Sequence, residues 1–212
     1  MLILNADRYI NEKLDIKPVT KTRLAALSPY KYKPKTKGEL IVCIENHIEE
    51  YGFFCNLNDI DVSCITNFSY LFSISTLKDF DGNISEWNVR NAKNMTGMFQ
   101  SSKFNGDISN WNVGNVTNMS YMFYNSYFDG DISKWNVGKV LNMENMFQNS
   151  DFNGDISNWN VSCVTKMSHM FCNSRFKGDL SRWSVGNVWH RHNIFKNCPM
   201  QYEEELQPDF RH

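Results

Sequence analysis

Long hydrophobic runs are missing from this 212-residue sequence. No stretch approaches the roughly 18 uninterrupted apolar residues that a membrane-spanning helix requires, so we expect no membrane span. The first residues, MLILNADRYINEKLD, carry acids at Asp7 and Glu12 and lack the apolar core of a signal peptide. The sequence therefore predicts a cytoplasmic protein without a signal peptide or anchor; the alternative is a secreted or cell-surface protein.

A strong charge of either sign is also missing, since the formal net charge is −1. A nearly neutral chain has no overall basic field to attract nucleic acid, which argues against a nucleic-acid partner. The charge is nevertheless distributed unevenly: residues 1–37 hold nine Lys or Arg against three Asp or Glu. We interpret residues 1–37 as a basic N-terminal segment and linker.

Catalytic and metal-binding motifs are absent as well. The six cysteines have no CxxC spacing, and no GxSxG, GxxxxGK[ST], GxGxxG or HExxH occurs. Asp107, Asp131, Asp155 and Asp179 recur at one interval, so they share one environment, whereas paired catalytic carboxylates need two different ones. The sequence therefore predicts no enzyme, no cofactor and no metal site, with these aspartates serving the turns.

An internal repeat dominates what is present. Tryptophan recurs every 24 residues, and two Phe columns, a Gly column and a Val column keep the same register. The columns are Trp87, Trp111, Trp135, Trp159 and Trp183; Phe80, Phe104, Phe128, Phe152 and Phe176; Gly82, Gly106, Gly130, Gly154 and Gly178; Val89, Val113, Val137, Val161 and Val185; and Phe99, Phe123, Phe147, Phe171 and Phe195. A fixed period of this length is the signature of a repeat protein whose units stack on one another.

Within one unit the apolar spacing changes. Ile108, Trp111 and Val113 have the LxxLxL spacing of a leucine-rich-repeat strand. Val116 and Met119 then step by three, which suits a short 3₁₀ or α turn on the opposite wall. We therefore expect an α/β solenoid, a leucine-rich-repeat-like parallel β stack of 24-residue repeats with a helical N-terminal cap.

The repeats are bounded by segments of different composition. Residues 38–56 contain Leu40, Ile44 and Ile48 at helical spacing and are expected to form a helical N-cap. Residues 57–195 comprise one degenerate and five regular repeats. Residues 196–212 are polar and acidic, which predicts a C-terminal cap or tail that keeps the end of the stack soluble.

The unit GDISNWNVGNVTNMSYMF closely resembles the BspA-like surface-protein repeat, also known as the mycoplasma lipoprotein DUF285 repeat, which is counted among leucine-rich repeats. The resemblance covers about residues 37–195. It implies a binding role, often as a surface-anchored adhesin or antigen, and brings no catalytic residues with it. Since the chain lacks the signal peptide, lipobox or anchor of the surface form, we expect an intracellular partner first.

Residues that face outward from a stack of repeats form columns, and these columns are the candidate contact residues. The strand face supplies Glu86, Asn88, Arg90, Asn110, Asn112, Lys134, Asn136, Asn158, Asn160 and Arg182. We favour Glu86, Arg90, Lys134 and Arg182, because variation within a strict repeat can encode a specific surface; the alternative is that they only keep the surface soluble. For the Asn column we expect side-chain amides that hydrogen-bond along the stack, with a contact role as the alternative. The turn wall supplies Tyr121, Tyr124 and Tyr127, which could anchor a partner or pack over the turns.

These observations predict a non-catalytic protein-binding scaffold that uses its repeat surface. We expect an intracellular interaction module or inhibitor of a host or partner complex, of the kind found in phage or effector proteins. The alternative is a bacterial surface adhesin or antigen of the BspA-like type. In either case the partner is a protein.

Overall fold

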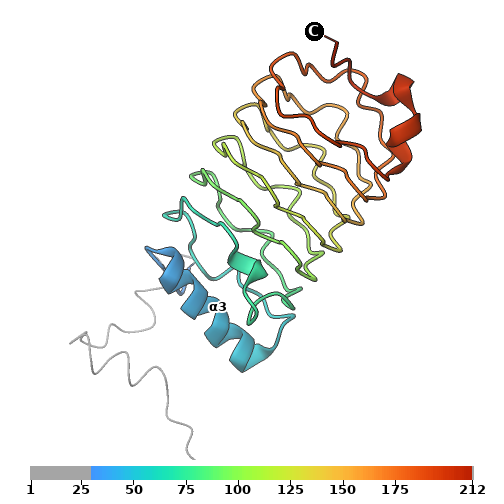
Figure 1. Ribbon diagram of the computed structural model, residues 1–212. Helices are drawn as coiled ribbons and strands as arrows, with labels where there is room; N and C mark the ends of the chain where they lie inside the picture. The colour runs from blue at the N-terminus through green and yellow to red at the C-terminus, as the bar shows by residue number, and fades with distance from the viewer. Residues whose placement is uncertain (1–29, 212) are drawn as a thin grey trace, which may run out of the picture.

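The computed structural model describes residues 30–211, and the first 29 residues of the basic N-terminal segment lie outside them. The chain winds into successive coils that lie on one another between a helix at one end and two short 3₁₀ helices at the other (Figure 1). The helix is α3 (Lys37–Tyr51), and the 3₁₀ helices are η2 (Pro199–Tyr202) and η3 (Glu204–Leu206). A further 3₁₀ turn, η1 (Leu71–Ser73), lies in the first coil.

Three aromatic columns fill the interior of the coils. The rings of Trp87 and Trp111 stack with their centroids 6.3 Å apart, those of Phe104 and Phe128 at 6.4 Å, and those of Phe99 and Phe123 at 5.6 Å. The same contacts recur from coil to coil because the sequence period equals one coil. These rings are almost entirely buried, so the apolar columns of the sequence form one continuous core.

The buried indoles also connect the coils through a polar bond. Nε1 of Trp111 donates to the carbonyl oxygen of Ile84 in the preceding coil at 3.1 Å. Trp135, Trp159 and Trp183 make the same bond to Ile108, Ile132 and Ile156. Each tryptophan therefore buries its ring without leaving its N–H unsatisfied, and the bond joins successive coils.

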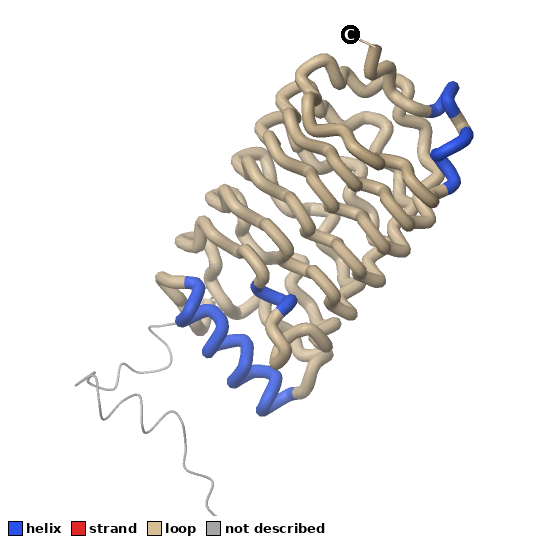
Figure 2. Tube along the Cα trace, viewed as in Figure 1, coloured by secondary structure: helices blue, strands red, loops and turns tan. Residues whose placement is uncertain are grey.

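Backbone pairing between coils differs from the expected β stack. Within residues 30–211 no strand forms, and most of the chain is assigned to turns and loops (Figure 2). Isolated parallel bridges join Asn94, Asn118, Asn142, Lys166 and His190 in succession. This row lies on the wall where the sequence predicts a short turn, and not on the wall of Ile108, Trp111 and Val113.

The reason is that N–H groups of the expected strand donate to carbonyl oxygens of the same coil and not to the neighbouring coil. The N–H of Trp111 donates to Ile108 at 3.1 Å and that of Val116 to Val113 at 2.9 Å, which are turn bonds. On the other wall the N–H groups of Met119, Tyr121 and Phe123 donate to carbonyls of the next coil at 2.9–3.0 Å. LxxLxL spacing describes which side chains point inward, but it does not decide where the inter-coil hydrogen bonds form.

Each coil turns on that second wall through residues with positive φ. Tyr121 has a φ of 59° and Asn125 a φ of 50°, and the equivalent positions of other coils hold mostly Asn. Asn tolerates this left-handed conformation better than most residues, which accounts for Asn at most of these positions. Gly97 occupies the equivalent of Tyr121, and there a Cβ would lie 2.4 Å from the ring of Tyr70.

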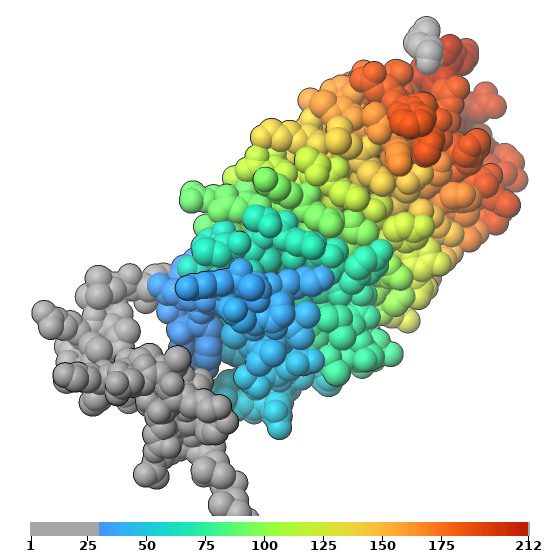
Figure 3. Space-filling view, turned by 60° about the vertical axis from the view of Figure 1, so that its left-hand side comes forward, coloured from blue at the N-terminus to red at the C-terminus, as the bar shows by residue number. Residues whose placement is uncertain are grey.

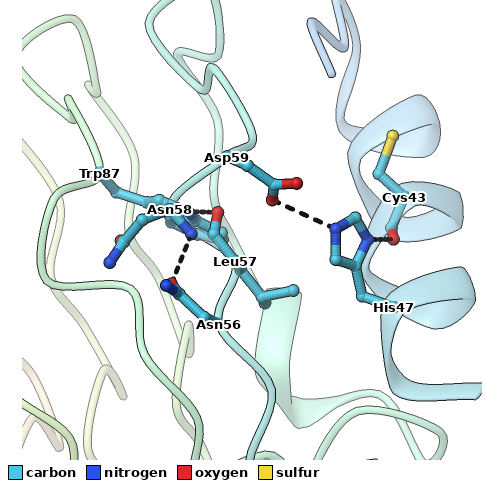
Figure 4. Close-up of polar contacts among 7 residues, drawn as sticks. All are labelled: Cys43, His47, Asn56, Leu57, Asn58, Asp59 and Trp87. Atoms are coloured by element: carbon cyan, nitrogen blue, oxygen red, sulfur yellow. Dashed lines mark hydrogen bonds and ion pairs between the residues drawn. The ribbon is translucent and has the colours of Figure 1, made fainter. Parts of the chain in front are cut away.

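Helix α3 closes the N-terminal end of the stack. It begins after Thr36, whose side-chain oxygen accepts a hydrogen bond from the N–H of Glu39, and it buries Leu40, Ile44 and His47 against the first coil. His47 is held by two bonds (Figure 4): Nδ1 lies 2.7 Å from the carbonyl oxygen of Cys43 and Nε2 lies 3.2 Å from Oδ1 of Asp59. A buried polar side chain thus fixes the helix to the first coil.

The C-terminal segment packs onto the last coil. Met200 is fully buried, and the N–H of Leu180 donates to the carbonyl oxygen of Leu206 at 2.8 Å. The guanidinium of Arg191, which stands in the methionine column, lies 5.8 Å from the ring centroid of Phe210 and donates to the carbonyl of that residue. The arginine therefore replaces an inward methionine where no further coil follows, and a folded segment covers the end.

Candidate interaction surfaces

The first candidate surface is the Trp wall, which we define as residues 84–90, 108–114, 132–138, 156–162 and 180–186. Ile108, Trp111 and Val113 point inward and are buried, whereas Asn110 and Asn112 between them are exposed. The ten residues expected on this face are all exposed except Asn88, which is half-buried. The structure therefore brings them together on one side of the stack.

The side-chain charge at equivalent positions varies along this wall, although the coils repeat the same backbone turns. One column reads Glu86, Asn110, Lys134, Asn158 and Arg182, and Arg90 follows its first member by four residues in the same coil. Residues in one column belong to successive coils, whose equivalent tryptophan rings lie 6.3–6.5 Å apart. The wall thus presents one negative and three positive groups, of which Glu86, Lys134 and Arg182 recur at every second coil.

The asparagine column of the Trp wall has a local role. The side-chain oxygen of Asn112 accepts from the N–H of Gly114 at 3.2 Å, and Asn136 and Asn160 make the same bond to Gly138 and Ser162 at 3.1 Å. These bonds stay within one coil, so the amide oxygens shape the turn instead of forming the chain of bonds along the stack that the sequence favoured. The amide nitrogens of Asn136 and Asn160 lie against the preceding coil, where a Cβ added at Gly114 or Gly138 would be 3.4 Å or 3.5 Å away.

The turn wall, residues 94–102, 118–126, 142–150, 166–174 and 190–198, carries two of the three expected tyrosines. Tyr121 is 36% exposed, Tyr124 is half-buried, and their ring centroids lie 5.7 Å apart. Tyr70 lies nearby over Gly97 and is 45% exposed, and it is not among the tyrosines expected from the sequence. A small residue at one position of a column that holds aromatics in other coils is the signal that could have identified this contact.

A further apolar pair was missed at the edge of the turn wall. Leu141 is 49% exposed and Trp189 is 66% exposed, in a column that otherwise holds Lys93, Thr117 and Thr165. The indole of Trp189 contacts the ring of His190, and Nδ1 of His190 lies 3.3 Å from Oε1 of Glu144. Large apolar residues in a polar column were the available sequence signal.

Tyr127 lies beyond the turn wall, in a groove that we call the corner groove. It has a volume of about 450 Å³ and follows the corner of the coils (lining residues include Lys78, Lys103, Tyr127, Asn149 and Arg175). Two ion pairs cross it, Lys103 Nζ to Asp79 Oδ1 at 2.9 Å and Arg175 Nε to Asp151 Oδ1 at 3.1 Å. The hydrogen bond from Lys103 lowers the pKa of Asp79.

The recurring aspartates serve the turns, as the sequence predicts. Oδ1 of Asp107 accepts from the N–H of Ser109 at 2.9 Å, and Asp131, Asp155 and Asp179 repeat this bond with the serine two residues later. The pKa of Asp107 is lowered mainly by that N–H and then by the serine hydroxyl. Asp131 and Asp155 follow the same order, and at Asp179 the hydroxyl of Ser181 has the larger effect.

This arrangement predicts acid sensitivity. A carboxyl whose pKa is lower in the folded state stabilises the fold above its unfolded pKa, and that stability is lost as the pH falls through the folded pKa. We expect the free energy of unfolding to fall between about pH 5 and about pH 2. The measurement is the urea midpoint at several pH values for the wild type and for a variant with all four aspartates replaced by Asn, which keeps the acceptor oxygen. An equal loss in both proteins would show that these carboxylates are not responsible.

Comparison with known protein families identifies most of the described chain. A family model described as a mycoplasma protein of unknown function, DUF285, matches residues 45–151 and 125–207, which span both walls and the corner groove. No curated protein and no solved structure matches the sequence. Among residues 30–211, none of the helices has the length and apolar character needed to cross a membrane.

Proposed function

This chain belongs to the DUF285 family, and from that premise we propose that it is a non-catalytic protein-binding scaffold whose coils form a solenoid of the leucine-rich-repeat, BspA-like type. We place its partner inside the cell, as an interaction module or inhibitor of a protein complex. The Trp wall is the proposed main contact surface.

One observation supports this proposal above the others: the buried columns repeat in successive coils, whereas one exposed column of the Trp wall changes its charge from coil to coil. Trp, Phe and Met occupy the same buried positions in successive coils, with their side chains almost fully covered. The exposed column beside them changes from Glu86 to Lys134 and Arg182. Identical buried residues give each coil the same backbone path, so the exposed column is held in the same place on every coil. Variation of charge in that column can then specify a partner, because charge complementarity contributes more to selectivity than to affinity.

The shape of the exterior favours a protein over a small molecule as the partner. The space-filling view shows an elongated body whose successive coils form bands along its length (Figure 3). Small-molecule sites are enclosed, mostly apolar cavities, whereas the corner groove is an open channel lined by Lys, Asp, Asn, Arg and Tyr side chains. A long, rigid surface of this kind matches the way repeat proteins bind other proteins.

The proposal is tested by capture of a partner from lysate of the native host with tagged protein, identified by mass spectrometry. We expect one protein or complex to be enriched. Replacing Glu86, Arg90, Lys134 and Arg182 by Ala together should reduce its recovery at least about tenfold, because a few residues usually supply most of the binding energy. These side chains are exposed, so the variant should fold normally.

A matched control replaces Lys93, Lys177, Lys196 and Glu205 by Ala, which removes the same charges at exposed positions outside the Trp wall. This control should retain the partner. Equal loss with both variants would reject the Trp wall as the contact surface. Adhesion of the wild-type protein to intact cells or matrix, with no enrichment from lysate, would replace the intracellular scaffold with the adhesin alternative.

A further inference from the structure

The corner groove contains a row of ion pairs on both sides of an exposed tyrosine, and none of its lining residues belongs to the Trp wall. Asp79, Lys103, Tyr127, Asp151 and Arg175 occupy the same position in five successive coils, so they form one row along the groove. The two ion pairs join neighbours in this row, and Tyr127 stands between the pairs. The ring of Tyr127 is 64% exposed, which makes it a large apolar surface flanked by charge.

The outward charge of the groove is positive. In the first pair the side chain of Lys103 is 64% exposed and that of Asp79 37%, and in the second Arg175 is 79% exposed and Asp151 38%. Lys78, a further exposed cation, lines the same groove. Ion pairs this exposed are weak, so each cation can also accept a carboxylate from a partner. Charge complementarity therefore favours an acidic ligand.

The spacing of the cations defines the form of that ligand. Lys103 and Arg175 are three coils apart, or about 14 Å at about 4.8 Å per coil. In an extended chain, residues four apart are separated by about 13 Å and point to the same side. The residue midway between them also points to that side. Tyr127 is one coil from Lys103 and two coils from Arg175, so its Cα lies about 2 Å from the midpoint, within reach of its large ring.

The polar groups of the groove suit an extended backbone. Ser101, Asn125 and Asn149 line it and are exposed, and Nδ2 of Asn125 donates to Oγ of Ser101 at 3.3 Å. Asn side chains both donate and accept, so they can pair with the N–H and C=O groups that an extended segment leaves free. A helix satisfies its own backbone groups and would gain nothing from them.

We propose that the corner groove binds an extended acidic protein segment with the pattern acid–x–apolar–x–acid, in which the acids contact Lys103 and Arg175 and the apolar side chain packs on Tyr127. This adds a second binding surface to the scaffold function proposed above. It specifies the partner by chemistry and register, and it can fail while the Trp wall still binds its own partner.

The test uses two labelled peptides of the same composition, acetyl-SESFSES-amide and acetyl-SEFSSES-amide, and the full-length protein. Fluorescence anisotropy should show binding of the first peptide and at least about tenfold weaker binding of the second, because moving Phe by one residue turns it to the other face. Raising the salt from about 0.15 M to about 1 M should weaken the first complex, since it shortens the Debye length from about 8 Å to about 3 Å.

Variants of the protein locate the site. Lys103→Gln, Arg175→Gln and Tyr127→Ser should each weaken the first peptide at least about threefold, and the exposed control Lys93→Gln should have no effect. Absence of binding, equal affinity for both peptides or unchanged affinity in the three variants would overturn the proposal. If the peptides fail while the lysate partner is still lost with the Trp-wall variant, the scaffold function stands and only the corner groove is rejected.

Discussion

Replacing Phe147 by Ala is expected to destabilise the protein by about 3–5 kcal/mol, the usual cost of truncating a fully buried phenylalanine. Phe147 is 0% exposed and stacks on Phe123 and Phe171 at 5.6 Å on either side, with Phe152 at 4.3 Å. The substitution would leave a cavity between Phe123 and Phe171. Each of these rings is packed within its own coil, so neither coil can move to fill the cavity. Denaturant unfolding followed by tryptophan fluorescence measures the loss.

Phe195→Ala is the matched control for this prediction. Phe195 ends the same column and is 8% exposed. Among residues 30–211 it stacks only on Phe171, at 5.8 Å, so a partner ring lies on one side. We expect its free energy of unfolding to fall by no more than about half as much as for Phe147→Ala. A similar loss in both variants would mean that stacking between coils contributes little beyond the burial of each ring.

The sequence predicts the interior of this fold well because the interior depends on period alone. The Trp, Phe, Met and Val columns are buried, and the residues between them on the Trp wall are exposed, as their spacing indicates. The exposure of Glu86, Lys134 and Arg182 follows from the same period. Their role as contact residues stays a prediction, since exposure does not identify a partner.

Backbone pairing could not be predicted in the same way. The N–H groups of Trp111 and Val116 can bond within the coil or to the next coil without changing which side chains face inward. The positive φ of Tyr121 and Asn125 places the inter-coil bonds on the turn wall, and Asn at most of these positions was the relevant signal.

The corner groove depends on relations between coils that the consensus repeat conceals. Lys103 and Asp79 are 24 residues apart, as are Arg175 and Asp151, and each pair has opposite charges. A consensus unit assigns one residue type to each position, so it hides the opposite charges that adjacent coils carry at this position. Comparison of one column from coil to coil would have shown alternating charge on both sides of Tyr127.

Gly82→Ala is the second substitution with a large expected effect, because the new methyl group has no room. An added Cβ would lie 2.1 Å from the carbonyl oxygen of Cys55 and 2.6 Å from Cε2 of Phe80. That carbonyl accepts the N–H of Asn83 at 3.0 Å, and the carbonyl of Asn83 accepts the N–H of Leu57 at 2.9 Å, so these bonds join the first two coils. We expect overpacking to cost about 1–3 kcal/mol and the strained bond about 1 kcal/mol more.

Two other glycines make this prediction specific. A Cβ at Gly130 would meet the ring of Phe128 at 2.8 Å but the nearest backbone oxygen only at 3.8 Å, so Gly130→Ala should cost less than Gly82→Ala. At Gly186 nothing lies within 4 Å and φ is not positive, so Gly186→Ala should be neutral or stabilise the fold by about 0.4–1 kcal/mol through the unfolded chain. Thermal or denaturant unfolding of the three variants should give this order. If Gly82→Ala were as stable as Gly186→Ala, the close approach of the Cys55 carbonyl would not constrain the first coil, and the position of Glu86 and Arg90 on the Trp wall would not depend on it.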